Sequence, residues 1–128
     1  MDRDRATHVT APLDASQMHA AAQTLVGTHD FTSFAAREAT QSKNPVRTIE
    51  RLSAERRGSR IVIDVEGPAF LMHMVRTIVG SLIEVGRGKR PAQWIADVLA
   101  ARDRTLAGPT APPQGLTLVW VRYGLADA

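Results

Sequence analysis

The sequence predicts an α+β domain in which helices cover one face of a small antiparallel sheet. Apolar residues recur at helical spacing in residues 14–27, 70–85 and 91–99. In residues 61–66 and 116–121 they recur at every second position, which is the spacing of a half-buried strand. Residues 46–57 add a further strand, so we expect the order α-β-β-α-α-β along the chain.

The first half of the chain contains the clearest local signals. Asp14 suits the N-cap of the first helix, Gln17 follows at the spacing of a capping box, and Gly27 suits the helix end. Residues 28–45 are expected to form a loop. The Gly58-Ser59 turn then joins the strands at 46–57 and 61–66 into an antiparallel hairpin.

The second half is expected to contain two helices and a final strand. The helix at 70–85 is followed by Pro91, which suits the first turn of the next helix. The buried stripe of that helix consists of Trp94, Ile95, Val98 and Leu99. A proline-rich loop at 108–115 leads to a strand at 116–123. We expect one domain over residues 13–124, with a lead-in segment at 1–12 and a tail at 125–128.

Composition indicates an ordinary soluble protein. The 128 residues suit one domain, with 44% hydrophobic and 23% charged residues. The chain has no apolar run of the ~18 residues that a membrane span needs, no signal-peptide pattern and no cysteine. We therefore expect a cytoplasmic protein without a membrane segment. Its four histidines do not have the spacing of a metal site, so no metal is expected.

Arg76 is the site candidate that the helical pattern indicates. It lies at the border of a wide apolar arc on the helix at 70–85, so we expect a half-buried guanidinium. No residue three or four positions away is acidic, so no intrahelical ion pair explains it. Because an unpaired buried charge is costly, this position favours a partner elsewhere. The alternative is an arginine whose long side chain merely reaches water.

Basic residues concentrate in one region, although the net charge of the chain is only +3. Residues 37–60 hold seven basic and three acidic residues, an excess that could attract phosphate. The RNA-binding candidates are Arg37, Lys43, Arg47, Arg56 and Arg57. The alternative is a solvated surface without a ligand, which composition alone favours.

Residues 29–34 admit both a functional and a structural interpretation. His29 beside Asp30 could form a catalytic pair, but such pairs more often order a loop through local hydrogen bonds. Phe31 and Phe34 could stack on bases, but we favour the interpretation that they anchor the loop to the core. The chain contains neither a P-loop nor a dinucleotide-binding fingerprint.

Four segments in this order resemble the C-terminal half of the bacterial tRNA pseudouridine synthase A family. They are GTHDFTSF at 27–34, VRTI at 46–49, FLMHMVRTIVG at 70–80, and APPQGL at 111–116 with the strand that follows. The resemblance covers residues 5–124, and residues 5–9 resemble the strand that leads into this half. The expected fold is therefore pseudouridine synthase-like.

The resemblance implies a reaction, a substrate and partners. Members of the family isomerise uridine to pseudouridine in the anticodon stem-loop, at tRNA positions 38 to 40, without a cofactor or metal. An aspartate carries out the chemistry and pairs with an arginine on a helix, for which Arg76 is the matching residue. Leu116 matches the segment that lines the uridine pocket. A homodimer that binds the tRNA anticodon arm is also implied.

The sequence departs from the family pattern at two important points, the catalytic aspartate and the tyrosine that packs on the target base, both of which the family carries in its N-terminal half. The family's aspartate lies in an Arg-Thr-Asp-Ala-Gly segment of the N-terminal half, and this chain contains no such segment. Asp14, Asp64 and Asp97 suit a helix cap, a strand and a helix surface, so none is a replacement. We expect part of a tRNA-modifying isomerase that is inactive without the N-terminal half. The alternative is a non-catalytic RNA-binding or dimerisation module.

Overall fold

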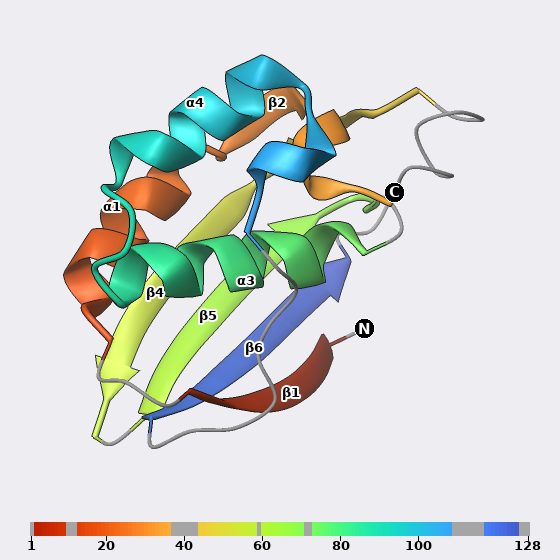
Figure 1. Cartoon of the computed structure of the whole chain (residues 1–128). Coiled ribbons are helices and arrows are strands. Elements are labelled where there is room, and N and C mark those ends of the chain that lie inside the picture. Colours follow the sequence, from red (N-terminus) through yellow and green to blue (C-terminus); the bar gives the residue numbers. More distant parts are fainter. Residues whose placement is uncertain are drawn as a thin grey trace.

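The computed structural model describes residues 2–9, 13–36, 44–58, 60–70, 73–108 and 117–125 (Figure 1). The described strands are β1 (Asp2–Val9), β2 (Gly27–Asp30), β3 (Val46–Ile49), β4 (Arg51–Arg57), β5 (Arg60–Gly67) and β6 (Thr117–Leu125). The described helices are α1 (Ala15–Gln23), α3 (Met74–Gly86), α4 (Gln93–Ala101) and the 3-10 helices η1 (Thr32–Phe34) and η2 (Arg104–Leu106). None of these helices is long and apolar enough to cross a lipid bilayer.

The main sheet has the strand order β1-β6-β5-β4, and α1, α3 and α4 cover one of its faces (Figure 1). β1 pairs with β6 and β4 with β5 in antiparallel fashion, whereas β5 and β6 run parallel. In the hairpin, Ala54 pairs with Ile63, and Arg57 pairs with Arg60. The α+β class, the hairpin and the helices on one face are confirmed. A strand, β1, precedes the predicted element order because it forms within the expected lead-in segment.

A second, two-stranded sheet replaces part of the predicted loop at 28–45. β2 pairs antiparallel with β3, and the hydroxyls of Thr28 and Thr48 hydrogen bond across this pair at 2.7 Å. The predicted strand at 46–57 is divided by a bend at Glu50, whose N–H donates to the Glu66 carbonyl at 2.7 Å. Both predictions were wrong in part because strand pairing depends on tertiary contacts that local spacing does not reveal.

The first helix has its predicted start but not its predicted end. Asp14 is the N-cap, and its Oδ1 accepts the Gln17 N–H at 3.1 Å. The helix ends at Gln23 with Thr24 as its C-cap, several residues before Gly27. Gly27 has a φ of +113° and begins β2. Because glycine adopts positive φ without a steric penalty, Gly27 allows the chain to turn from the helix into this strand.

Side chains of α1 also cover the outer edge of β4. Gln23 Nε2 donates to the Leu52 carbonyl at 2.8 Å, and the ring Nδ1 of His19 accepts the Ala54 N–H at 3.3 Å. An edge strand otherwise offers such backbone groups to another chain. The helix therefore closes this edge of the sheet.

α3 is the central helix, and it starts at Met74 rather than at residue 70. The small or polar residues Thr77, Gly80 and Ser81 are not part of the apolar arc of this helix, but all three are buried. Gly108, which follows η2, covers Ser81, and its N–H donates to Ser81 Oγ at 3.0 Å. A Cβ built on Gly108 would lie 3.1 Å from the Ser81 Cα. The small residues of α3 therefore admit a second backbone at close range.

Ser33 connects η1 to α4 and to the segment after it. Its buried hydroxyl donates to the Val98 carbonyl at 2.6 Å and accepts the Asp103 N–H at 2.8 Å. We expect Ser33→Ala to lower the free energy of unfolding by about 1–3 kcal/mol, because two backbone groups lose their partner. Urea denaturation measures the change, and Ser53→Ala on the opposite face of the sheet should stay within about 0.5 kcal/mol. Equal midpoints for the two variants would contradict this role of Ser33.

Candidate functional site

Arg76 lies in the first turn of α3 and is the only exposed residue of that helix. Every other position of its 13 residues is buried or partly buried. Within the described part of the chain, no hydrogen bond or ion pair reaches the Arg76 guanidinium. The predicted half-buried position was wrong. Arg76 is the third residue of the helix, at the border of its apolar arc, and its side chain extends into solvent. A buried helix thus presents a single solvent-facing cation.

The backbone that precedes Arg76 has an uncommon conformation. His73, the N-cap of α3, has a φ of +62°, in the left-handed region. For a residue other than glycine this conformation costs about 1–3 kcal/mol. The His73 carbonyl accepts the Thr77 N–H at 3.0 Å, so the helix closes directly after it. The neighbouring Met74 and Ile78 are buried in the core and hold this turn in place.

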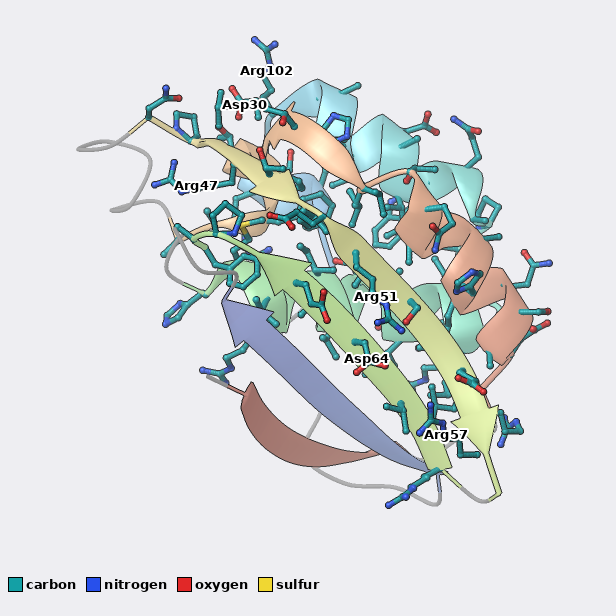
Figure 2. All side chains as sticks on the ribbon, turned by 180° about the vertical axis from the view of Figure 1, so that it is seen from behind. Asp30, Arg47, Arg51, Arg57, Asp64 and Arg102 are labelled. Carbon is teal, nitrogen blue, oxygen red and sulfur yellow. The ribbon has the colours of Figure 1, made fainter. Side chains whose placement is uncertain are left out.

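The basic candidates do not form one continuous patch in the described structure. Arg37 and Lys43 lie outside the described residues. Arg47 lies on β3, whereas Arg56 and Arg57 lie at the far end of β4, and Figure 2 shows Arg47 and Arg57 at opposite ends of the molecule. Extended chain of this length spans up to roughly 30 Å. The basic residues that are close in the sequence are therefore spread along the extended chain of β3 and β4.

Arg47 is engaged in local structure. Its Nη1 donates to the Asn44 carbonyl at 2.6 Å and to the Val46 carbonyl at 2.7 Å. Its Nε is buried and has no partner among the described residues. The guanidinium therefore orders the chain that enters β3, and only part of its donor set remains for a phosphate.

Arg56 and Arg57 are exposed at the tip of the hairpin. Arg56 Nη2 donates to the Leu13 carbonyl, and Arg57 Nη2 lies 3.3 Å from Glu55 Oε2. A guanidinium carries five N–H donors, so each of these contacts leaves others that face solvent. Leu116, the candidate for the substrate pocket, lies outside the described residues.

Residues 21–124 match the family model described as tRNA pseudouridine synthase. The chain belongs to the tRNA pseudouridine synthase family. The matched region begins within α1 and extends into β6, so it includes Arg76, the helices α3 and α4, and the strands β4 and β5 of the main sheet.

Relatives named tRNA pseudouridine synthase A share more than half of the aligned residues with this synthase-family chain. The protein from Acidiphilium cryptum (strain JF-5) is 55% identical over 116 residues, which cover 91% of this chain and 45% of the relative. The protein from Cronobacter sakazakii (strain ATCC BAA-894) is 53% identical over 117 residues, which cover 91% of this chain and 43% of the relative. The chain therefore spans less than half the length of these curated relatives.

In this member of the synthase family, His29 and Asp30 order the turn after β2. Asp30 Oδ1 accepts the N–H and the hydroxyl of Thr32 at 2.9 Å and 2.5 Å, and its Oδ2 lies 3.7 Å from Arg102 Nε. His29 Nε2 lies 3.0 Å from the Val26 carbonyl. These contacts agree with the structural interpretation of the pair.

Phe31 and Phe34 are fully buried in the core of the synthase domain. Neither ring is available to stack on a base, so their role as anchors of the loop is confirmed. Within the described ranges, no group of three histidine or carboxylate side chains is placed to hold a metal ion.

Asp30 gives the synthase domain a predictable pH dependence. Burial raises its pKa, but hydrogen bonds from Thr32 and the charge of Arg102 more than offset this, so the pKa lies below its ordinary value of 3.8. A carboxylate with a lowered pKa stabilises the fold above the unfolded-state pKa, and this stabilisation is lost as pH falls through the folded-state pKa. We therefore expect stability to decline below about pH 4.

The variant Asp30→Asn tests this dependence. Its amide oxygen can still accept the Thr32 N–H but does not titrate, so we expect a shallower loss of thermal stability as the pH falls from about 6 to about 2. The melting temperature at each pH is the measurement. Identical curves for the variant and the unchanged chain would contradict a contribution from Asp30.

The sequence analysis did not predict one basic cluster. Residues 87–90, between α3 and α4, contain Arg87, Lys89 and Arg90, outside the region of concentrated charge at 37–60. The Gly86-Arg87-Gly88 segment within this turn is too short to be a nucleotide-binding motif. Three cations within four positions of a predicted turn were the signal that could have found it.

Proposed function

We propose that this chain forms the C-terminal part of a tRNA pseudouridine synthase A, an isomerase that converts uridine to pseudouridine in the anticodon stem-loop of tRNA. Arg76 pairs with a catalytic aspartate from a segment outside this chain, and neither a metal nor a cofactor takes part. The observation that carries the proposal is the exposed Arg76, which has no partner among the described residues and projects from an otherwise buried helix.

The chemistry requires more than this arginine. The uracil base must be detached from its sugar, rotated and rejoined through carbon. A guanidinium stays protonated at neutral pH, so it can neither act as a base nor attack the sugar or base. A carboxylate can do both. The arginine's planar donors can bind that carboxylate through two hydrogen bonds, which hold it in place and lower its pKa.

The described aspartates support the view that the isolated chain is inactive. Asp14 caps α1, and Asp97 Oδ1 accepts a hydrogen bond from Gln93 on the same exposed helix surface at 3.2 Å. Asp64 lies on the sheet face that the helices leave open, where Figure 2 shows it with Arg51. Arg76 projects from the helical layer on the other face of the sheet, and among the described residues none of the three carboxylates forms an ion pair with it.

The remaining assignments rest on the family resemblance and on the basic candidates. The substrate is tRNA, whose phosphates are bound by Arg37, Lys43, Arg47, Arg56 and Arg57. Leu116 lines the uridine pocket. The active form is a cytoplasmic homodimer that includes the N-terminal half of the same enzyme.

A reconstitution experiment tests this function. The isolated chain is incubated with unmodified tRNA and assayed for pseudouridine. The assay is repeated with the chain joined to the part of the Acidiphilium cryptum relative that it does not cover, since 45% of that protein is already represented here. We expect no product from the isolated chain and pseudouridine in the anticodon stem-loop from the joined protein.

Each result has a distinct meaning. Product from the isolated chain would contradict the proposal that the carboxylate comes from elsewhere. An inactive joined protein that folds and binds tRNA would instead favour a non-catalytic RNA-binding module. An inactive joined protein that does not bind tRNA would overturn the proposed function.

A further inference from the structure

The turn between α3 and α4 presents two cations on a well-anchored backbone. Gly88 has a φ of +80°. Its N–H donates to the Val85 carbonyl at 3.0 Å, and the Lys89 N–H donates to the Glu84 carbonyl at 3.1 Å. This is the Schellman arrangement that ends a helix and satisfies its last carbonyls. The side chains of Lys89 and Arg90 are exposed.

Arg90 is further oriented by an aromatic ring. Its guanidinium carbon lies 5.3 Å from the centroid of the Trp94 ring, and Trp94 is itself partly buried against the core. A cation–π contact of this kind restricts the guanidinium while leaving its N–H edge free. Within the described ranges, neither Lys89 nor Arg90 forms an ion pair. The turn thus offers unneutralised cations whose positions are restrained before a ligand arrives.

The tip of the β4–β5 hairpin reaches the same end of the molecule. The Asp14 N–H donates to the Gly86 carbonyl at 2.9 Å, which joins the start of α1 to the end of α3. Arg56 Nη2 donates to the carbonyl of Leu13, the residue before Asp14. Figure 1 shows the α3–α4 turn beside the start of α1, with the end of β4 next to it. Two segments that are distant in sequence therefore contribute cations to one surface.

The charge of this surface is positive after its acidic neighbours are counted. The cations are Arg56, Arg57, Arg60, Arg87, Lys89 and Arg90, and the neighbouring acids are Asp14, Glu55 and Glu84. Six positive charges against three negative charges leave an excess of three. Glu55 is already paired with Arg57, so the excess is centred on Arg56, Lys89 and Arg90.

The position of the surface indicates the size of its ligand. Arg76 and Gly86 lie at opposite ends of α3, and the helical rise between them is roughly 15 Å. A single nucleotide at Arg76 cannot reach the turn, whereas the backbone of an RNA helix carries closely spaced phosphates over such distances.

We propose that Arg56, Lys89 and Arg90 form a phosphate-binding surface for the backbone of a tRNA helix, away from the uridine that reacts. The inference rests on the proposed function for the identity of the RNA. It differs from the candidate set at 37–60 because it separates Arg56 from Arg47 and places it with residues of the α3–α4 turn.

The double variant Lys89→Ala/Arg90→Ala of the chain tests this surface. Its affinity for unmodified tRNA is measured over a range of salt concentrations. We expect the slope of log affinity against log salt to decrease in magnitude by about 2, since each lost phosphate contact removes about 1. At roughly 0.1 M salt the affinity should fall about tenfold or more. Both side chains are exposed, so circular dichroism and the melting temperature should stay unchanged.

The matched control is Arg51→Ala/Arg102→Ala, which removes the same charge from exposed positions elsewhere. Arg51 lies on the open sheet face and Arg102 follows α4, so the control should keep most of the affinity and slope. An equal loss in both double variants would mean that only net charge matters and would overturn the proposal. Equal binding of tRNA and polyglutamate by the unchanged chain would also overturn it.

A kinetic measurement separates this inference from the proposed function. In the protein joined to the part of the Acidiphilium cryptum relative that this chain does not cover, Lys89→Ala/Arg90→Ala should raise KM for tRNA. The double variant should leave kcat unchanged, because neither side chain contacts a reacting group. If the joined protein makes no pseudouridine but the salt-dependent loss of binding persists, the proposed function fails and the surface stands. A lower kcat with an unchanged KM would overturn the surface.

Discussion

Replacing Arg76 by alanine is expected to remove most of the pseudouridine formation by the joined protein. The variant removes the only exposed side chain of α3, and among the described residues no hydrogen bond or ion pair reaches its guanidinium. Loss of one preorganised charge at an active site typically lowers kcat by about 10²- to 10³-fold. Single-turnover measurements with unmodified tRNA would show whether the loss lies in the chemical step.

The same substitution should leave the fold intact. Arg76 is exposed, and its removal opens no cavity, so the free energy of unfolding should change by less than about 0.5 kcal/mol. Arg76→Lys is a useful companion, because it keeps the charge but loses the planar donors that bind a carboxylate at two points. We expect it to be nearly as inactive as the alanine variant. A wild-type kcat in the Arg76→Ala variant would contradict the proposed role of Arg76 in the active site.

Gly67→Ala is expected to have the largest effect on stability. Gly67 ends β5, and a Cβ at this position would lie 2.5 Å from the Thr48 carbonyl oxygen and 3.1 Å from the Phe70 ring. The carbonyl belongs to the backbone of β3, so it cannot move aside as a flexible side chain would. The junction also includes the hydrogen bond from the Glu50 N–H to the Glu66 carbonyl, which holds the two sheets together. We expect a loss of about 3 kcal/mol, the upper part of the usual range for overpacking.

Gly58→Ala is the control for this prediction. Gly58 has a φ of +65°, but a Cβ there meets nothing within 4 Å. Only the backbone penalty applies, so the cost should be about 1 kcal/mol. Urea denaturation of both variants gives the comparison, and a smaller loss for Gly67→Ala than for Gly58→Ala would contradict the close approach of β3 to β5.

Local chemistry made several elements predictable. The Asp14 cap, the hairpin around Gly58 and the buried stripe of α4 each depend on residues within a few positions of one another. Capping hydrogen bonds and amphipathic spacing act over such short ranges. The division at Glu50 and the pairing of β2 with β3 were not predictable in this way, because each requires a partner distant in sequence.

The candidate site likewise combines features that local sequence predicts with features that depend on segments distant in sequence. The helical pattern placed Arg76 beside the apolar arc, but it could not show that Thr77 and Ser81 on the other side would also be buried. The burial of Ser81 depends on Gly108, which packs on α3 from 27 positions away in the sequence. Once that side is covered, Arg76 becomes the one exposed position of the helix.

The charge pattern was similarly incomplete. Arg47 and Arg57 belong to one basic region of the sequence, yet they lie at opposite ends of the molecule because the chain between them is extended (Figure 2). Arg56 lies instead near the turn that carries Lys89 and Arg90, since Leu13 and Asp14 bridge the hairpin to the end of α3.

The residue pattern alone was enough for the α+β class, the start of the first helix, the hairpin and the family resemblance, because these depend on spacing and side-chain type along the chain. Tertiary structure alone decided that Arg76 is exposed, that α3 is covered on nearly every side, and that Arg56 joins the α3–α4 turn. Exposure and charge clustering depend on which distant segments pack together, and that is set by burial of the whole core.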